Sequence, residues 1–118
     1  MQRIHQLLLI SGITIAVLTS GPALAQSAAF RMPGCRSFAK ADNPVRYDFS
    51  GGVCYGTVEA LMSAGHVMGI CPPSESTVDQ GVRLVVQYVD SQPTRLHENF
   101  DALAIEALRK AWLCSGPQ

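Results

Sequence analysis

The sequence predicts an all-α protein: a small disulfide-stapled bundle of about four helices that follows a cleaved signal peptide. Three observations support this fold class. Apolar residues recur at i, i+3 and i+4 in several segments, which is the spacing of one helical face. Four cysteines lie beyond the N-terminal apolar run, and an even number in an exported chain favours disulfides. Once the helical segments are assigned, no segment remains that predicts a β-strand.

Residues 1–25 have the three parts of a secretory signal peptide. Arg3 supplies a positive start, LLLISGITIAVL is an apolar run of the expected length, and residues 23–25 (ALA) form a small-residue cleavage site. The run is shorter than the roughly 20 residues that span a membrane. We therefore expect cleavage after Ala25, a periplasmic location and no membrane contact afterwards. The 93 residues of 26–118 suffice for a single small domain.

The charge balance excludes some classes of partner. The full chain has nine basic and nine acidic residues, and loss of Arg3 with the signal leaves a net charge of −1. No stripe of basic residues is present, so we expect neither nucleic acid nor an anionic membrane as a partner.

The first expected helix, residues 32–41 (MPGCRSFAKA), is short. Pro33 is expected in its first turn, because a proline further inside removes a hydrogen bond and clashes with the preceding turn. The side chains of Cys35, Phe38 and Ala39 would then face inward.

The second expected helix covers residues 48–65 (DFSGGVCYGTVEALMSAG). Ser50 can cap it. Its apolar residues occupy two overlapping faces, which is typical of a central helix. Gly52 and Gly56 lower helix propensity, and we expect them to let a neighbouring backbone approach closely.

The third expected helix begins at Thr77, which forms a capping box with Gln80, and ends before Pro93. Its valines could also indicate a strand. The cap and the i+3/i+4 spacing of the apolar face favour a helix; that face comprises Val78, Val82, Val85, Val86 and Val89.

The fourth expected helix lies in residues 99–114 (NFDALAIEALRKAWLC). Asn99 is a good N-cap, and Asp101 in the first turn complements the helix dipole. Glu106 and Lys110 are spaced for an i,i+4 ion pair on a solvated face.

The cysteines have three possible uses: a metal site, a nucleophile or covalent staples. Their spacing contains no C-x-x-C, so zinc knuckles, thioredoxin-like sites and c-type haem attachment lack their local signature. The histidines after the signal, His66 and His97, lie in polar stretches, and a Cys–His catalytic pair is not expected. No paired carboxylates, Ser-His-Asp set or phosphate loop stands out. We therefore expect no enzyme activity, metal or cofactor, and interpret the cysteines as staples.

Four cysteines allow three connectivities. Cys71 begins the third helix and Cys114 ends the fourth, and consecutive helices with short links tend to run antiparallel, which brings these two ends together. We therefore predict disulfides Cys71–Cys114 and Cys35–Cys54. A linkage of Cys35 to Cys114 with Cys54 to Cys71 is the alternative.

Several motifs in order resemble the Rap/Tai family of type VI secretion immunity proteins. That family has a Cys-x-Gly helix, Cys-x-Pro leading to Thr-x-x-Gln, a Val-Val-x-Tyr helix, a Pro, a Leu-His and an Ala-Leu that ends in Cys. The matching residues are Cys54 with Gly56, Cys71 with Pro73, Thr77 with Gln80, Val85-Val86 with Tyr88, Pro93, Leu96-His97, Ala107-Leu108 and Cys114. One difference is Pro33-Gly34, where members usually carry a continuous leucine-rich helix.

The resemblance implies a small periplasmic helical protein that binds and inhibits a toxic peptidoglycan amidase by occluding its active site, and members often form dimers. Two other functions stay open. A small periplasmic chaperone of the acid-stress type would expose apolar surface when acid neutralises its carboxylates. An interaction protein of another kind would share the same composition.

A loop that fills the open groove of a peptide-cutting hydrolase is the simplest inhibitory element. The longer candidate, residues 63–76 (SAGHVMGICPPSES), is anchored at Cys71, so less conformational entropy is lost on binding. We expect its contacts at His66, Met68, Ser74 and Glu75. The alternatives are residues 90–100, a helix face, or no binding role for either loop.

Overall fold

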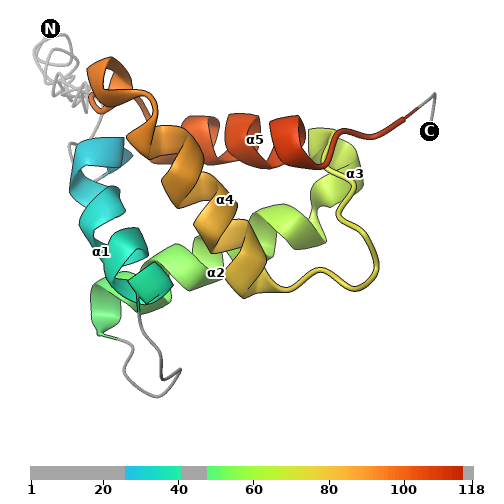
Figure 1. The fold of residues 1–118 in the computed structure, drawn as a ribbon, viewed down its shortest axis with the longest axis horizontal. Coiled ribbons are helices and arrows are strands. Elements are labelled where there is room, and N and C mark those ends of the chain that lie inside the picture. The colour runs from blue at the N-terminus through green and yellow to red at the C-terminus, as the bar shows by residue number, and fades with distance from the viewer. Residues whose placement is uncertain (1–25, 41–47, 116–118) are drawn as a thin grey trace, which may run out of the picture.

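The computed structural model describes residues 26–40 and 48–115, and there the protein is all-α (Figure 1). The expected signal peptide, residues 1–25, lies outside the described residues. The helices, in chain order, are α1 (Ala28–Lys40), α2 (Phe49–Ser63), α3 (Gly65–Met68), α4 (Val78–Asp90), the 3₁₀ turn η2 (Pro93–Arg95) and α5 (Phe100–Ala111). None of these helices is both long and apolar enough to cross a membrane.

The helices pack in pairs around one core. α1 packs mainly against α2, and α4 packs against α1, α2 and α5. In Figure 1, α5 lies along the upper side of the molecule and α2 along the lower side, and α4 runs diagonally across the view. Within the described residues, no polar or charged side chain is buried. The largest fully buried side chains are Phe100, Met32, Ile70, Leu103, Leu108, Val58, Val82, Val85, Val89, Cys35 and Cys54.

α1 begins four residues earlier than the sequence indicated. The N–H groups of Ala28 and Ala29, which lack partners within the helix, donate to the carbonyls of Glu98 and Leu96 at 2.9 and 2.8 Å. Pro33 is consequently the sixth helical residue, and its expected place in the first turn was wrong. The carbonyl of Ala29 loses its i+4 donor there, but both residues are exposed, so water can reach that carbonyl.

Gly34 explains how α1 can carry the Pro33-Gly34 pair at the contact with α2. A Cβ at Gly34 would lie 2.5 Å from the carbonyl oxygen of Ser50, so only glycine allows the two backbones to approach this closely. The close approach expected at Gly52 and Gly56 was wrong, because both are exposed and a Cβ at either would meet nothing within 4 Å.

Asp48 caps α2, and the expected cap at Ser50 was wrong. The Asp48 carboxylate accepts a hydrogen bond of 2.7 Å from the backbone N–H of Gly51. An aspartate at this position is the better cap, because its negative charge also interacts favourably with the N-terminal end of the helix dipole.

The predicted N-terminal caps of α4 and α5 are confirmed, whereas one predicted ion pair is not. The capping box of Thr77 and Gln80 is present, and Asn99 caps α5 by accepting from the N–H of Ala102 at 3.1 Å. The expected ion pair of Glu106 with Lys110 was wrong. Glu106 pairs with Arg95 instead, at 2.8 Å.

The two disulfides join the cysteines as predicted. Cys35–Cys54 links α1 to α2 inside the core, where its cysteines are 0 % and 2 % exposed. Cys71–Cys114 links the chain after α3 to the chain after α5, and both of its cysteines are half-buried. The outer bridge therefore holds together two segments that carry no long helix of their own.

Candidate partner-binding site

Residues 63–76, expected to be one loop, contain a helical turn in their first half. α3 ends at Gly69, whose φ of 72° lies in the left-handed region that favours glycine. The N–H of Ile70 donates to the Gly65 carbonyl at 2.7 Å and closes the turn. The backbone here is thus held by its own hydrogen bonds.

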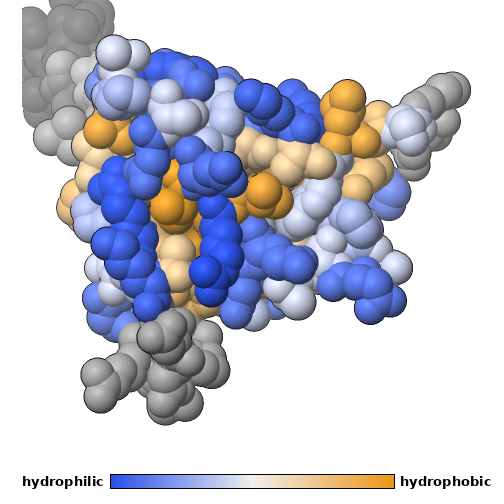
Figure 2. Space-filling model, viewed as in Figure 1, coloured by the Kyte–Doolittle hydropathy of each residue, from blue (hydrophilic) through white to orange (hydrophobic). Residues whose placement is uncertain are grey.

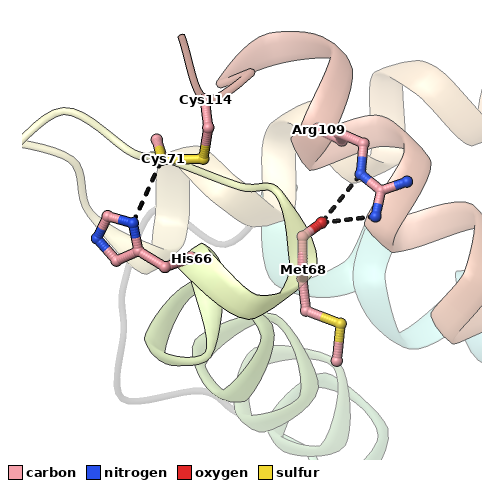
Figure 3. Close-up of a disulfide and its surroundings, with 5 residues drawn as sticks. All are labelled: His66, Met68, Cys71, Arg109 and Cys114. Atoms are coloured by element: carbon pink, nitrogen blue, oxygen red, sulfur yellow. Dashed lines mark hydrogen bonds between the residues drawn. A yellow bond between two sulfur atoms is a disulfide. The ribbon is translucent and has the colours of Figure 1, made fainter. Parts of the chain in front are cut away.

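Contacts from α5 and the chain after it hold α3 in place (Figure 3). The Arg109 guanidinium donates to the Met68 carbonyl oxygen through Nε and Nη2, at 2.9 and 2.6 Å. The N–H of Cys71 donates to the Trp112 carbonyl at 2.7 Å. With the disulfide to Cys114, these contacts fix α3 against the C-terminal end of α5.

His66 projects from α3 toward the outer disulfide (Figure 3). Its Nδ1 lies 3.6 Å from Cys71 Sγ, and because a disulfide sulfur carries no hydrogen, the imidazole is the donor. His66, Cys71 and Cys114 form a group, among the described residues, whose ligand atoms are close enough for one metal ion. The disulfide bond occupies both sulfurs of that group.

Two large apolar side chains on this end of the molecule are exposed. Val67 is 90 % exposed and Leu113 is 69 % exposed. Figure 2 shows hydrophobic surface where α3 meets the chain that follows α5. We call the surface formed by His66, Val67 and Leu113 the α3 tip. Neither apolar residue was predicted as a site residue: the single turn around Val67 is too short to show which side it faces, and Leu113 lies beyond the end of α5.

The four residues predicted to contact a partner do not form one cluster. His66, Ser74 and Glu75 are exposed, whereas Met68 is half-buried and packs against the core. His66 belongs to the α3 tip, but Glu75 lines a separate hollow beside α4. The predicted loop therefore supplies two surfaces.

The hollow beside α4 has a volume of about 490 Å³ and is floored partly by Trp112. A second hollow of about 290 Å³ shares Leu84 and Gln87 with it and continues between α4 and α5. Together they make a shallow groove that begins at the loop carrying Glu75. The remaining lining residues are Pro73, Ser76, Gln80 and Arg83 in the first hollow and Tyr88, Ser91, Ala107, Lys110 and Ala111 in the second.

The alternative loop, residues 90–100, makes many contacts within the protein that stabilise the fold. Arg95 donates to Glu98 through Nε and Nη2, both at 2.8 Å, and to Glu106 through Nη1 and Nη2, at 2.8 and 3.0 Å. The Tyr88 hydroxyl donates to Glu106 as well, at 2.8 Å. The carbonyls of this loop accept the first N–H groups of α1. The side chains of Arg95 and Glu98 and the carbonyls of Leu96 and Glu98 are therefore occupied within the protein.

These contacts shift the acidity of the network. Hydrogen bonds from Arg95 and then Tyr88 lower the pKa of Glu106 to about 2. The Arg95 hydrogen bonds also lower the pKa of Glu98, and the hydrogen bond to Glu106 raises the pKa of Tyr88. Both carboxylates consequently stay ionised well below neutral pH.

The comparisons with known proteins give one match. The model of the family described as Rap1a immunity proteins matches residues 20–114, a range that includes both disulfides and all the helices of the described residues. No curated protein and no solved structure matches the chain significantly.

Proposed function

The chain belongs to the family of Rap1a immunity proteins, and from this membership we propose that it binds and inhibits a type VI secreted peptidoglycan amidase. An immunity protein protects a cell by binding a toxic effector, so the expected activity is binding and not catalysis. The amidase as target rests on the resemblance described above to immunity proteins of type VI secretion. The single observation that carries the proposal is the family match over residues 20–114.

We propose that the α3 tip is the part that blocks the amidase. An enzyme that cuts extended peptides has an open groove, and a rigid protrusion can fill it. Val67 and Leu113 offer exposed apolar anchors, and the exposed His66 beside the disulfide offers a hydrogen-bonding group. Because the hydrogen bonds and the disulfide already order this segment, binding costs little additional conformational entropy. Ser74 and Glu75 would contribute to the rim of the interface.

We also propose export to the periplasm with cleavage after Ala25. Two disulfides are typical of an oxidising compartment. Peptidoglycan lies in the same compartment, so the inhibitor would meet the amidase where the enzyme acts. Mass measurement of the protein recovered from a periplasmic fraction checks the cleavage site: a mature chain that starts at Gln26 is expected.

The test requires the cognate amidase, which is sought first among the products of neighbouring genes, and measures both inhibition and the dissociation constant. We expect Val67→Asp and Leu113→Asp each to weaken binding by about 100-fold or more, since a charge would enter a desolvated contact. Phe49→Asp is the matched control, because Phe49 is 88 % exposed and lies at the start of α2, outside the α3 tip. It should change affinity by no more than about 3-fold.

The outcomes separate the function from the surface. A wild-type protein that leaves the amidase fully active contradicts the proposed function. Inhibition that survives both tip substitutions but is lost in Phe49→Asp moves the binding surface to the start of α2. Inhibition that survives all three and is lost in Trp112→Ala, with the fold intact, moves it to the groove beside α4.

A further inference from the structure

The three potential ligands at the outer disulfide come from positions that no local metal motif connects. Cys71 lies five residues after His66, and Cys114 lies 43 residues after Cys71. The fold nevertheless brings His66 Nδ1 and the two sulfurs within 4.8 Å of one another. Figure 3 shows the imidazole turned toward the sulfurs from α3.

The spacing of His66 Nδ1 and Cys71 Sγ suits a tetrahedral zinc ion, and the two sulfurs have to separate when their bond is opened. Zn–S bonds of about 2.3 Å and a Zn–N bond of about 2.1 Å place a sulfur and a nitrogen about 3.6 Å apart. The distance from His66 Nδ1 to Cys71 Sγ is 3.6 Å. Two thiolates and one imidazole are a soft donor set that favours Zn²⁺ over Mg²⁺ or Ca²⁺.

The backbone around the two cysteines is held together independently of the S–S bond. Ile70 and Leu113 form an antiparallel bridge, and the N–H of Cys71 bonds the Trp112 carbonyl at 2.7 Å. Opening the disulfide therefore leaves both sulfurs at the same end of the molecule. The inner disulfide has no such ligand beside it, because the described residues place no histidine in the core.

We propose that reduction of the Cys71–Cys114 disulfide creates a Zn²⁺ site whose protein ligands are His66, Cys71 and Cys114, with water in the fourth position. A dithiol supplies two electrons and two protons, becomes a disulfide itself and leaves two protein thiols. Zn²⁺ then binds both sulfurs as thiolates, and two protons go to solvent. The oxidised protein cannot bind the ion in this way, because each sulfur is bonded to the other.

Zinc and the disulfide are thus two alternative clamps on the same three segments. Each ties α3 and the chain that follows it to the chain after α5. Both cysteines are half-buried and His66 is exposed, so a dithiol and a metal ion can reach the group without unfolding the core. The site would keep the α3 tip ordered in a reducing environment, where the disulfide alone would be lost.

The experiment uses the whole mature chain, treated with just enough dithiol to open the half-buried outer disulfide while the buried inner one stays closed, and Zn²⁺ as the probe. The dithiol is removed without oxygen before Zn²⁺ is added. We expect one equivalent of Zn²⁺ to bind while the helical circular-dichroism signal is kept. Co²⁺ in place of Zn²⁺ should give the near-ultraviolet charge-transfer band of thiolate ligation. Zn²⁺ should protect Cys71 and Cys114 from alkylation, while Cys35 and Cys54 stay unmodified in their disulfide with or without the ion.

Two histidine variants decide the role of the imidazole. His66→Ala should weaken Zn²⁺ binding at least 10-fold, whereas His97→Ala, the matched control on another exposed histidine, should leave it unchanged. Unaltered binding in His66→Ala overturns the three-ligand site. So does equal alkylation of Cys71 and Cys114 with and without Zn²⁺, the absence of a bound equivalent, or loss of the helical signal when the outer disulfide is opened.

Discussion

Removing the inner disulfide, Cys35–Cys54, should destabilise the protein more than removing the outer one, Cys71–Cys114, although the inner disulfide closes the shorter loop. We consider replacing each pair by alanine. Cys71–Cys114 closes 43 residues and Cys35–Cys54 closes 19. In the chain-entropy model these loops correspond to about 4 kcal/mol and about 3.2 kcal/mol at 25 °C. By loop entropy alone, the outer pair should therefore cost about 0.8 kcal/mol more to remove.

Burial reverses this order. Cys35 and Cys54 are 0 % and 2 % exposed, so each alanine leaves a hole where a sulfur packed in the core. A buried group of that size is worth about 1 kcal/mol, and two of them add about 2 kcal/mol to the inner pair. The outer sulfurs are half-exposed and leave little cavity. We expect losses of about 5 kcal/mol for the inner pair and about 4 kcal/mol for the outer pair.

Urea unfolding of the two double variants and the wild type at 25 °C measures these losses. Both variants should also show larger m-values, because their unfolded chains are more expanded. A larger loss for the outer pair would mean that loop closure, and not packing of the sulfurs, decides the contribution of each bridge.

Two further predictions concern the core and the ion-pair network. Leu103→Asp and Val82→Asp should unfold the domain, because both residues are 0 % exposed and a buried charge costs several kcal/mol. Lys110→Ala should shift the melting temperature little. A Leu103→Asp variant that melts at the wild-type temperature would contradict the assigned core face. The pKa of Glu106 is lowered from 4.5 to about 2, so its contribution is present above pH 4.5 and is lost as the pH falls toward 2. Because the Glu106 side chain is 43 % exposed, Glu106→Gln should lower the free energy of unfolding by only about 1 kcal/mol at pH 7. Urea unfolding should show this difference from wild type shrinking between pH 4.5 and 2. A difference that does not change with pH would show that the bond with Arg95 does not depend on the charge.

The parts of the fold that the sequence predicted well are those determined by neighbouring residues. The cap at Thr77 and the valine face of α4 depend on residues within a few turns of each other. The outer disulfide was predicted correctly from the expectation that Cys71 begins a helix, although α4 begins only at Val78. The cap and the valine face depend on short-range geometry, which a sequence pattern contains.

The parts that failed depend on residues far apart in the chain. α1 begins at Ala28 because carbonyls from Leu96 and Glu98, about 70 residues later, accept its first N–H groups. Glu106 pairs with Arg95 and not with Lys110, because η2 brings a guanidinium within 2.8 Å. No periodicity within either segment contains that information.

The candidate site was predicted only in part for the same reason. The loop that carries His66 was identified, but the exposed Leu113 joins it through an antiparallel bridge between residues 43 positions apart. The close approach of His66, Cys71 and Cys114 likewise arises from the fold and not from a local motif. A search for closely spaced cysteines cannot detect such a group.

The contrast between the two loops gives a physical reason to place binding at the α3 tip. In residues 90–100, Arg95 is held by two carboxylates, and the loop carbonyls hold α1, so a partner would have to break contacts that stabilise the fold. At the α3 tip the internal contacts are made by backbone groups, the disulfide, Arg109 and His66, and none of them uses the side chain of Val67, which is 90 % exposed. A partner can therefore cover that side chain without breaking any of the contacts that hold α3. A surface that is ordered by its backbone and apolar in its side chains is suited to tight binding, since little entropy is lost and apolar area is gained.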